Sequence, residues 1–118
     1  MIMRYILKDY SFGKIKVNDS EHTADLIVGP DFLKANWWRK EGHKVCLEDL
    51  AEVENLKPEI LIIGTGAYGR VRVPQSVIEA FEKQDCTVKV LKTKQAVELY
   101  NLLTEKQKKV VAALHLTC

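Results

Sequence analysis

The feature that most constrains the fold is a short, wholly apolar segment that leads directly into glycines. Residues 60–63 read Ile-Leu-Ile-Ile, and residues 64–69 follow as Gly-Thr-Gly-Ala-Tyr-Gly. A continuous run rich in β-branched residues is typical of a strand that is covered on both faces. The sequence therefore predicts a central, buried strand with a glycine loop at its carboxyl end.

Helix and strand patterns alternate on either side of this segment. An apolar stripe predicts a helix over residues 47–55. Residues 70–73 alternate as Arg-Val-Arg-Val, which predicts a strand with both arginines on one face. A helix over residues 74–83 is expected to begin with proline in its first turn, and Thr93 is the expected N-cap of a helix over residues 93–103. The remaining expected strands cover residues 87–91 and 110–114. This alternation favours an α/β fold, a sheet with helical cover.

The first third of the chain is expected to hold short strands joined by tight turns. Residues 14–17 alternate Lys-Ile-Lys-Val, which is the period of a half-buried strand. Asn-Asp-Ser at residues 18–20 is a turn signal, and residues 21–23 are the expected return strand of a hairpin. Residues 26–28 predict another strand, whereas residues 36–43 combine aromatic and charged groups without periodicity.

Length and composition indicate one ordinary globular domain. The chain has 118 residues, of which 47% are hydrophobic and 29% charged, and its formal net charge is +2. With no linker or repeat, we expect a single domain over residues 1–118. The small net charge argues against a nucleic-acid partner, and no stretch approaches the roughly 20 apolar residues of a membrane span.

Cysteine usage and the first residues favour the cytosol. Cys46, Cys86 and Cys118 make an odd number without disulfide-like spacing. Reduced thiols are typical of a reducing compartment. Residues 1–7 are not followed by the apolar segment and cleavage site of a secretory leader, so we expect a cytoplasmic protein.

The glycine run matches the pattern of a dinucleotide-binding fingerprint without its structural context. Such a site needs a helix that begins within the glycines, so that its first amides face the pyrophosphate. Here the extended residues 70–73 intervene, and the helix is expected only from Pro74. Lys92 and Lys94 also stand near the position where the fingerprint has an acidic residue. We therefore expect no nucleotide cofactor.

Two interpretations of the glycine loop remain. The glycines allow positive φ angles and close backbone packing. Alternatively, successive amides in the loop form a concavity that binds a small anion. In that version Thr65 and the amides of the next two residues hold the anion, an arginine adds charge-assisted hydrogen bonds, and His43 or Glu41 transfers a proton. The predicted ligand-binding residues are Arg39, His43, Thr65, Gly66, Ala67, Tyr68 and Arg70.

Other chemical motifs are weaker. His43 with Cys46 and His115 with Cys118 together offer a zinc-like set, but His115 and Cys118 point to opposite faces if the last strand continues. We therefore predict no metal site and no catalytic residue. The tryptophan pair in residues 36–43 could stack nucleic-acid bases, but one core tryptophan and one that covers a loop is the commoner arrangement.

Several of these segments, taken in order, resemble a known family. They are residues 36–43 (Asn-Trp-Trp-Arg-Lys-Glu-Gly-His), the strand end at residues 62–66, Val73-Pro74, the pattern of residues 93–101 and the final His-Leu-Thr-Cys. As a set they are similar to domain of unknown function 498. That family includes archaeal and bacterial single-domain proteins, the mammalian adipogenesis-associated domain protein and, more distantly, mitochondrial complex I assembly factor 3.

The resemblance implies a three-layer α/β domain around a mixed central sheet, with extra β-structure near the N-terminus. It supplies no catalytic residues, and the form of residues 37–43 resembles archaeal members. Two hypotheses follow. In the first, the chain is a non-catalytic protein-binding or assembly-support module, acting on a partner or as a homodimer. In the second, it binds a small anion at the glycine loop, with or without catalysis.

Overall fold

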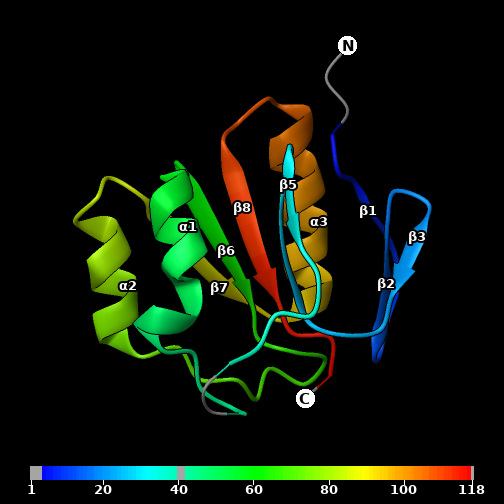
Figure 1. The fold of residues 1–118 in the computed structure, drawn as a ribbon, viewed down its shortest axis with the longest axis horizontal. Coiled ribbons are helices and arrows are strands. Elements are labelled where there is room, and N and C mark those ends of the chain that lie inside the picture. The colour runs from blue at the N-terminus through cyan, green and yellow to red at the C-terminus, as the bar shows by residue number, and fades with distance from the viewer. Residues whose placement is uncertain (1–3, 40–41, 118) are drawn as a thin grey trace.

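A five-stranded mixed sheet organises the computed structural model, which describes residues 4–39 and 42–117 (Figure 1). The strand order is β5-β4-β8-β6-β7. β6 is parallel to both β7 and β8, whereas β4 is antiparallel to both β5 and β8. The strands are β4 (Leu26–Gly29), β5 (Phe32–Lys34), β6 (Ile60–Gly64), β7 (Thr87–Leu91) and β8 (Val110–Leu114).

A second, antiparallel sheet is built from the N-terminal strands in the order β1-β2-β3. They are β1 (Leu7–Ser11), β2 (Lys14–Val17) and β3 (Ser20–His22). This sheet is tied to helix α3 (Thr93–Glu105) through Asn101, whose side chain accepts a hydrogen bond from the Leu7 N–H and donates one to the Leu7 carbonyl. The extra β-structure expected near the N-terminus is therefore present.

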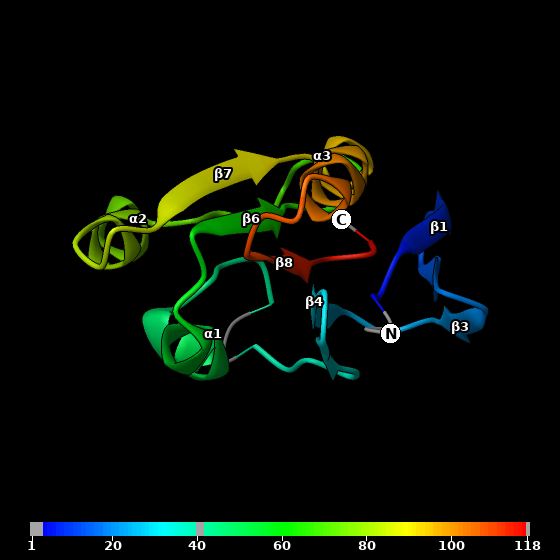
Figure 2. The same cartoon turned by 90° about the horizontal axis from the view of Figure 1, so that it is seen from above.

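The five-stranded sheet is covered on both faces, which gives three layers (Figure 2). Helix α3 and the small sheet pack on one face, where Ile15, Ala112 and Tyr100 are fully buried. The other face is covered by a 3₁₀ turn η1 (Leu47–Leu50), α1 (Ala51–Leu56) and α2 (Gln75–Glu82). Leu61 and Ile63 point to this second face, and Ile62 points to the first. The wholly apolar sequence of β6 follows from this two-sided burial.

Most predicted elements are confirmed, and the α/β fold class with them. The strands at residues 14–17, 26–28, 60–63, 87–91 and 110–114 are all present. Helical structure occurs in each of the three predicted regions, although residues 47–50 of the first form the 3₁₀ turn that precedes α1. The sequence pattern did not predict two of the short strands, β1 and β5. Among the described residues, no helix is both long and apolar enough to cross a bilayer.

Two local predictions are wrong. Residues 70–73 form no strand, since Arg72 makes only an isolated bridge to Lys44 and the Val71 N–H donates back to Thr65. This segment wraps around the strand ends, so only Val71 is buried. Thr93 is the first residue of α3, after Lys92 at the N-cap. Its hydroxyl is directed into the protein, toward the end of β8.

Candidate functional site

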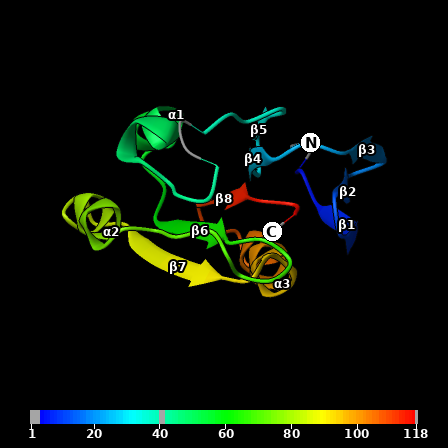
Figure 3. The same cartoon turned by 90° about the horizontal axis from the view of Figure 1, so that it is seen from below.

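The carboxyl ends of β6, β7 and β8 meet at one end of the molecule, and four loop segments gather there (Figure 3). They are the β1–β2 turn at Phe12, the glycine loop of residues 64–69, residues 36–39, and residues 116–117. The Gly13 N–H donates to the Leu116 carbonyl, and the Ala67 N–H donates to the Thr117 carbonyl. We call these four segments the strand-end face. Open α/β sheets bind ligands at this edge.

The glycines of the loop are required by the backbone. Gly66 and Gly69 have φ angles of 101° and 69°, a region that side chains disfavour. A Cβ on Gly64 would lie 2.9 Å from both a Leu114 methyl group and the Thr93 hydroxyl. The glycines of the loop therefore serve backbone conformation and close packing. The helix that follows the loop begins only at Gln75, which is too late in the sequence for a dinucleotide site.

Donors that the anion hypothesis requires are already engaged within the protein. The Gly66 N–H donates to the Thr93 hydroxyl oxygen at 2.9 Å, and the Ala67 N–H donates to the Thr117 carbonyl at 3.1 Å. The Thr65 hydroxyl donates to the Leu91 carbonyl at 3.1 Å. An anion held by these groups would have to displace each of these hydrogen bonds.

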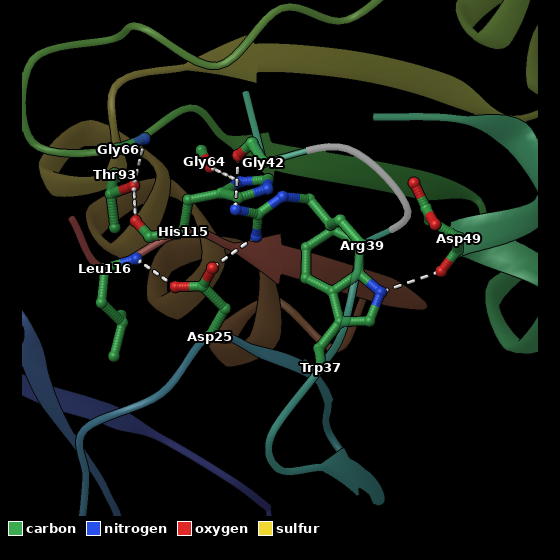
Figure 4. A network of polar contacts seen from close by, with 10 residues as sticks. All are labelled: Asp25, Trp37, Arg39, Gly42, Asp49, Gly64, Gly66, Thr93, His115 and Leu116. Carbon is green, nitrogen blue, oxygen red and sulfur yellow. Dashed lines mark hydrogen bonds and ion pairs between the residues drawn. The ribbon is translucent and has the colours of Figure 1, made fainter. Parts of the chain in front are cut away.

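Behind the loop lies a buried histidine that the sequence did not single out as part of this site. The His115 Nδ1–H donates to the Gly64 carbonyl at 2.6 Å, and the ring packs 5.0 Å from that of Trp37 (Figure 4). Burial, with the nearby Arg39 guanidinium, lowers the pKa of His115 to about 4. The imidazole is therefore neutral at pH 7. The Thr93 hydroxyl donates to the His115 carbonyl at 2.6 Å, which joins β8 to α3 and the loop.

An ion pair completes this buried region. The Arg39 guanidinium donates to the Asp25 carboxylate and, at 2.7 Å, to the Gly42 carbonyl. Asp25 also accepts the Leu116 N–H at 2.8 Å. Arg39 lies 5.7 Å from the Trp37 ring centre. We call Asp25, Trp37, Arg39 and His115 the inner cluster (Figure 4). Its interactions fix residues 36–39 against the ends of β4 and β8.

A cleft of about 360 Å³ opens beside the inner cluster. Its lining includes Asn36, Trp38 and Thr117 together with the Asp25–Arg39 pair. Trp38 is 85% exposed, whereas Trp37 is 4% exposed. The indole N–H of Trp37 donates to the Asp49 carbonyl at 2.9 Å. One tryptophan therefore belongs to the core, and the other forms an open wall of the cleft.

A second aromatic group lies across the strand-end face. Phe12 and Tyr68 are 60% and 64% exposed, and their ring centres are 6.0 Å apart. The Arg70 guanidinium lies 5.5 Å from the Tyr68 ring centre. We call Phe12, Tyr68 and Arg70 the outer cluster. Large aromatic groups exposed together are typical of contact surfaces.

The structure brings the two predicted loops together through their backbones. The Arg72 N–H donates to the His43 carbonyl, and the Val71 N–H donates to the Thr65 carbonyl. Tyr68 and Arg70 lie together, whereas Arg39 is largely buried and paired with Asp25. For the zinc-like set, His115 is engaged by Gly64, and Cys118 lies outside the described residues.

Sequence reasoning missed Phe12, Asp25 and the site role of Thr93 and His115. A histidine directly after an all-apolar strand was the one available signal for His115, because a buried strand end leaves its next residue partly enclosed. Asp25 and Phe12 carry no such signal. Their place in the site depends on contacts with Leu116, Arg39 and Tyr68, which are distant in sequence.

Comparison with known proteins defines the class of this small α/β domain. A family model described as "Protein of unknown function (DUF498/DUF598)" matches residues 7–115, and the chain belongs to this family.

Solved structures share the fold over nearly the whole chain. One, described as an outer membrane protein from Bartonella henselae, is 23% identical with a TM-score of 0.82, covering 99% of this chain and 98% of that chain. A conserved hypothetical protein from Pyrococcus horikoshii is 25% identical with a TM-score of 0.79, covering 95% and 98%. A Mth938-like domain from Bordetella pertussis is 18% identical with a TM-score of 0.75, covering 95% and 85%.

Proposed function

We propose that this domain is a non-catalytic protein-binding module that recognises an acidic, apolar segment of another protein through its strand-end face. The observation that carries the proposal is the outer cluster. Two aromatic rings and an arginine are exposed together on loops whose backbone is held by the protein's own hydrogen bonds. Tyrosine and arginine are among the residues that contribute most to protein–protein binding.

The charge of the surrounding loops defines the partner. Residues 64–74 and 92–95 contain Arg70, Arg72, Lys92 and Lys94 and no acidic residue. These four cationic side chains belong to exposed residues that follow the ends of β6 and β7. Opposite charges across an interface speed association and set its orientation. A partner segment with carboxylates beside apolar side chains therefore fits this face better than a basic one.

The glycine loop is held by internal hydrogen bonds, which supports its use as a binding surface. The amides of Thr65, Gly66 and Ala67 are all bonded internally, so the outer cluster is held in place before a partner arrives. Pre-organised surfaces lose less conformational entropy on binding. We expect this module to act in the cytosol, where its thiols stay reduced.

The test is a peptide array with systematic variation of charge and apolar content. We expect peptides that combine Asp or Glu with aromatic residues to bind the wild-type protein, with affinity that falls as salt rises. Tyr68→Ala and Arg70→Glu should each weaken binding about tenfold. Leu102→Ala changes an exposed apolar side chain on α3 and serves as the matched control, which should bind as wild type. An array in which no peptide discriminates Tyr68→Ala from wild type would refute the proposal.

The small anion remains a second candidate because Arg70 is exposed beside the loop. A thermal-shift titration with inorganic phosphate tests it directly. At a hundredfold excess over its dissociation constant, a bound anion stabilises a fold by about 2.7 kcal/mol. Stabilisation by phosphate that Arg70→Gln removes would favour the anion site, and an unchanged melting temperature would exclude tight anion binding.

A further inference from the structure

We infer that the cleft beside Trp38 binds one uncharged aromatic side chain of the partner segment, stacked on the Trp38 indole. The inference rests on the proposed function, since the aromatic side chain belongs to the segment that covers the strand-end face. It assigns a specific occupant to a cleft that lies apart from the outer cluster.

The size and walls of the cleft fit one aromatic ring with its adjoining backbone. Its volume of about 360 Å³ lies at the lower end of the range for ligand pockets. Trp38, 85% exposed, offers an open indole face, and aromatic rings stack on one another with a gain beyond the area that they bury. Asn36 and Thr23 line the same cleft and carry side-chain amide and hydroxyl groups that can bond the backbone of the segment.

The charge of the cleft selects an uncharged group. Among the described residues that line it, the charged ones are Asp25 and Arg39, which neutralise each other. Their side chains are only 18% and 11% exposed. His115, behind them, is neutral because burial lowers its pKa to about 4. A charged ligand would have to compete with this pair and lose its own hydration.

Thr117 links the cleft to the loop that carries the outer cluster. Thr117 lines the cleft, and its carbonyl accepts the N–H of Ala67, the residue before Tyr68. A single extended segment can therefore place an aromatic side chain on Trp38 and its carboxylates near Arg70. The two sites differ in character, since Arg70 forms no ion pair with any described residue whereas Arg39 is already neutralised.

Nuclear magnetic resonance of the ¹⁵N-labelled protein tests the cleft with small probes. The indole N–H of Trp38 reports on the cleft, and that of Trp37, bonded to the Asp49 carbonyl, is an internal reference. N-acetylphenylalaninamide should shift the Trp38 signal saturably, with a dissociation constant on the order of 1 mM. The anionic N-acetylphenylalanine and the cationic 2-phenylethylamine should bind about tenfold more weakly. N-acetylalaninamide should give no saturable shift.

Two variants sharpen the assignment. The backbone amide of Thr117, which also lines the cleft, should shift with N-acetylphenylalaninamide in the wild-type protein. Trp38→Ala should abolish this saturable shift, while Phe12→Ala, outside the cleft, should retain it. Asp25→Asn removes the charge that neutralises Arg39, so the anionic probe should then bind at least as well as the uncharged one. The Trp37 signal shows whether this variant keeps its fold.

The small-probe results that would overturn the cleft assignment differ from the peptide-array result that would refute the proposed function. No saturable shift, or an equal shift with N-acetylalaninamide, would refute an aromatic site. Saturation by adenosine without any by N-acetylphenylalaninamide would assign the cleft to a small heterocycle. If N-acetylphenylalaninamide binds but no peptide of the array does, the cleft is an aromatic site and the partner segment is refuted as the source of the aromatic group.

A peptide that binds in the array supplies the direct test of the occupant. Replacing its aromatic residue by leucine should weaken binding about tenfold to wild type and have no further effect on Trp38→Ala. Equal losses in both proteins would show that the aromatic side chain binds elsewhere.

Discussion

The strand-end face carries two clusters made of the same kinds of side chain, and the protein uses them in opposite ways. In the inner cluster Arg39 lies over Trp37, and in the outer cluster Arg70 lies over Tyr68, at similar distances of 5.7 and 5.5 Å. Trp37 is buried and Arg39 is bonded to Asp25, whereas Tyr68 is mostly exposed and Arg70 has no ion-pair partner among the described residues. An arginine over an aromatic ring is therefore uninformative by itself. Burial and carboxylate pairing separate a structural cluster from a binding surface.

This comparison predicts that substitutions in the inner cluster lower the unfolding free energy strongly, while those in the outer cluster leave it nearly unchanged. The largest effect is expected for Asp25→Ala. It leaves the Arg39 guanidinium poorly solvated and the Leu116 N–H without its acceptor, at a cost of about 3 to 4 kcal/mol in unfolding free energy. Urea denaturation measures it, with Asp25→Asn as the milder control. A loss below about 1 kcal/mol would show that the inner cluster is no structural unit.

Acid should destabilise the fold through His115. Its pKa is about 4 in the folded protein and near 6.5 when unfolded, so the unfolded state takes up the proton first as the pH falls. The contribution of neutral His115 to the unfolding free energy is complete above about pH 6.5, declines as the pH falls, and is lost below about pH 4. The shift corresponds to about 3 kcal/mol.

His115→Asn keeps a side-chain donor for the Gly64 carbonyl without the titration. Its unfolding free energy should therefore vary less with pH between 6.5 and 4 than that of wild type. Identical pH profiles for the two proteins would exclude His115 as the source of the acid sensitivity.

Thr93→Val should cost about 2 kcal/mol, because it removes the acceptor of the Gly66 N–H and the donor to the His115 carbonyl without a large change in volume. Thr93→Ser retains the hydroxyl and should recover most of the loss. Thermal or urea denaturation of the pair measures the difference. If serine and valine were equally destabilising, the methyl group and not the hydroxyl would hold the glycine loop.

The smallest effect on stability is expected in the outer cluster. Tyr68→Ala should change the unfolding free energy by no more than about 0.5 kcal/mol, since the ring is largely exposed. The same substitution should weaken partner binding about tenfold. A loss of stability comparable to that of Asp25→Ala would erase the distinction between the two clusters.

Much of the fold could be predicted from the sequence because it follows from local patterns. The apolar run of β6, the alternation in β2 and the helical stripes each record whether one or both faces of an element are buried. Residues 70–73 show the limit of this reasoning. Their alternation is that of a strand because Val71 is buried and Val73 packs partly against the core. A loop that crosses the strand ends buries these side chains as well as a strand would.

The candidate site was predictable only in part. The sequence by itself determined that glycines follow a buried strand and that Tyr68 and Arg70 lie just beyond it. Only the tertiary structure decided that the loop amides bond to Thr93 and Thr117, and that Arg39 is neutralised by Asp25. These contacts join residues that are well separated along the chain, 14 positions apart for Asp25 and Arg39 and 27 for Gly66 and Thr93. A hydrogen-bond donor is available to a ligand only when no such partner already accepts its hydrogen. That availability depends on three-dimensional packing, which no local pattern records.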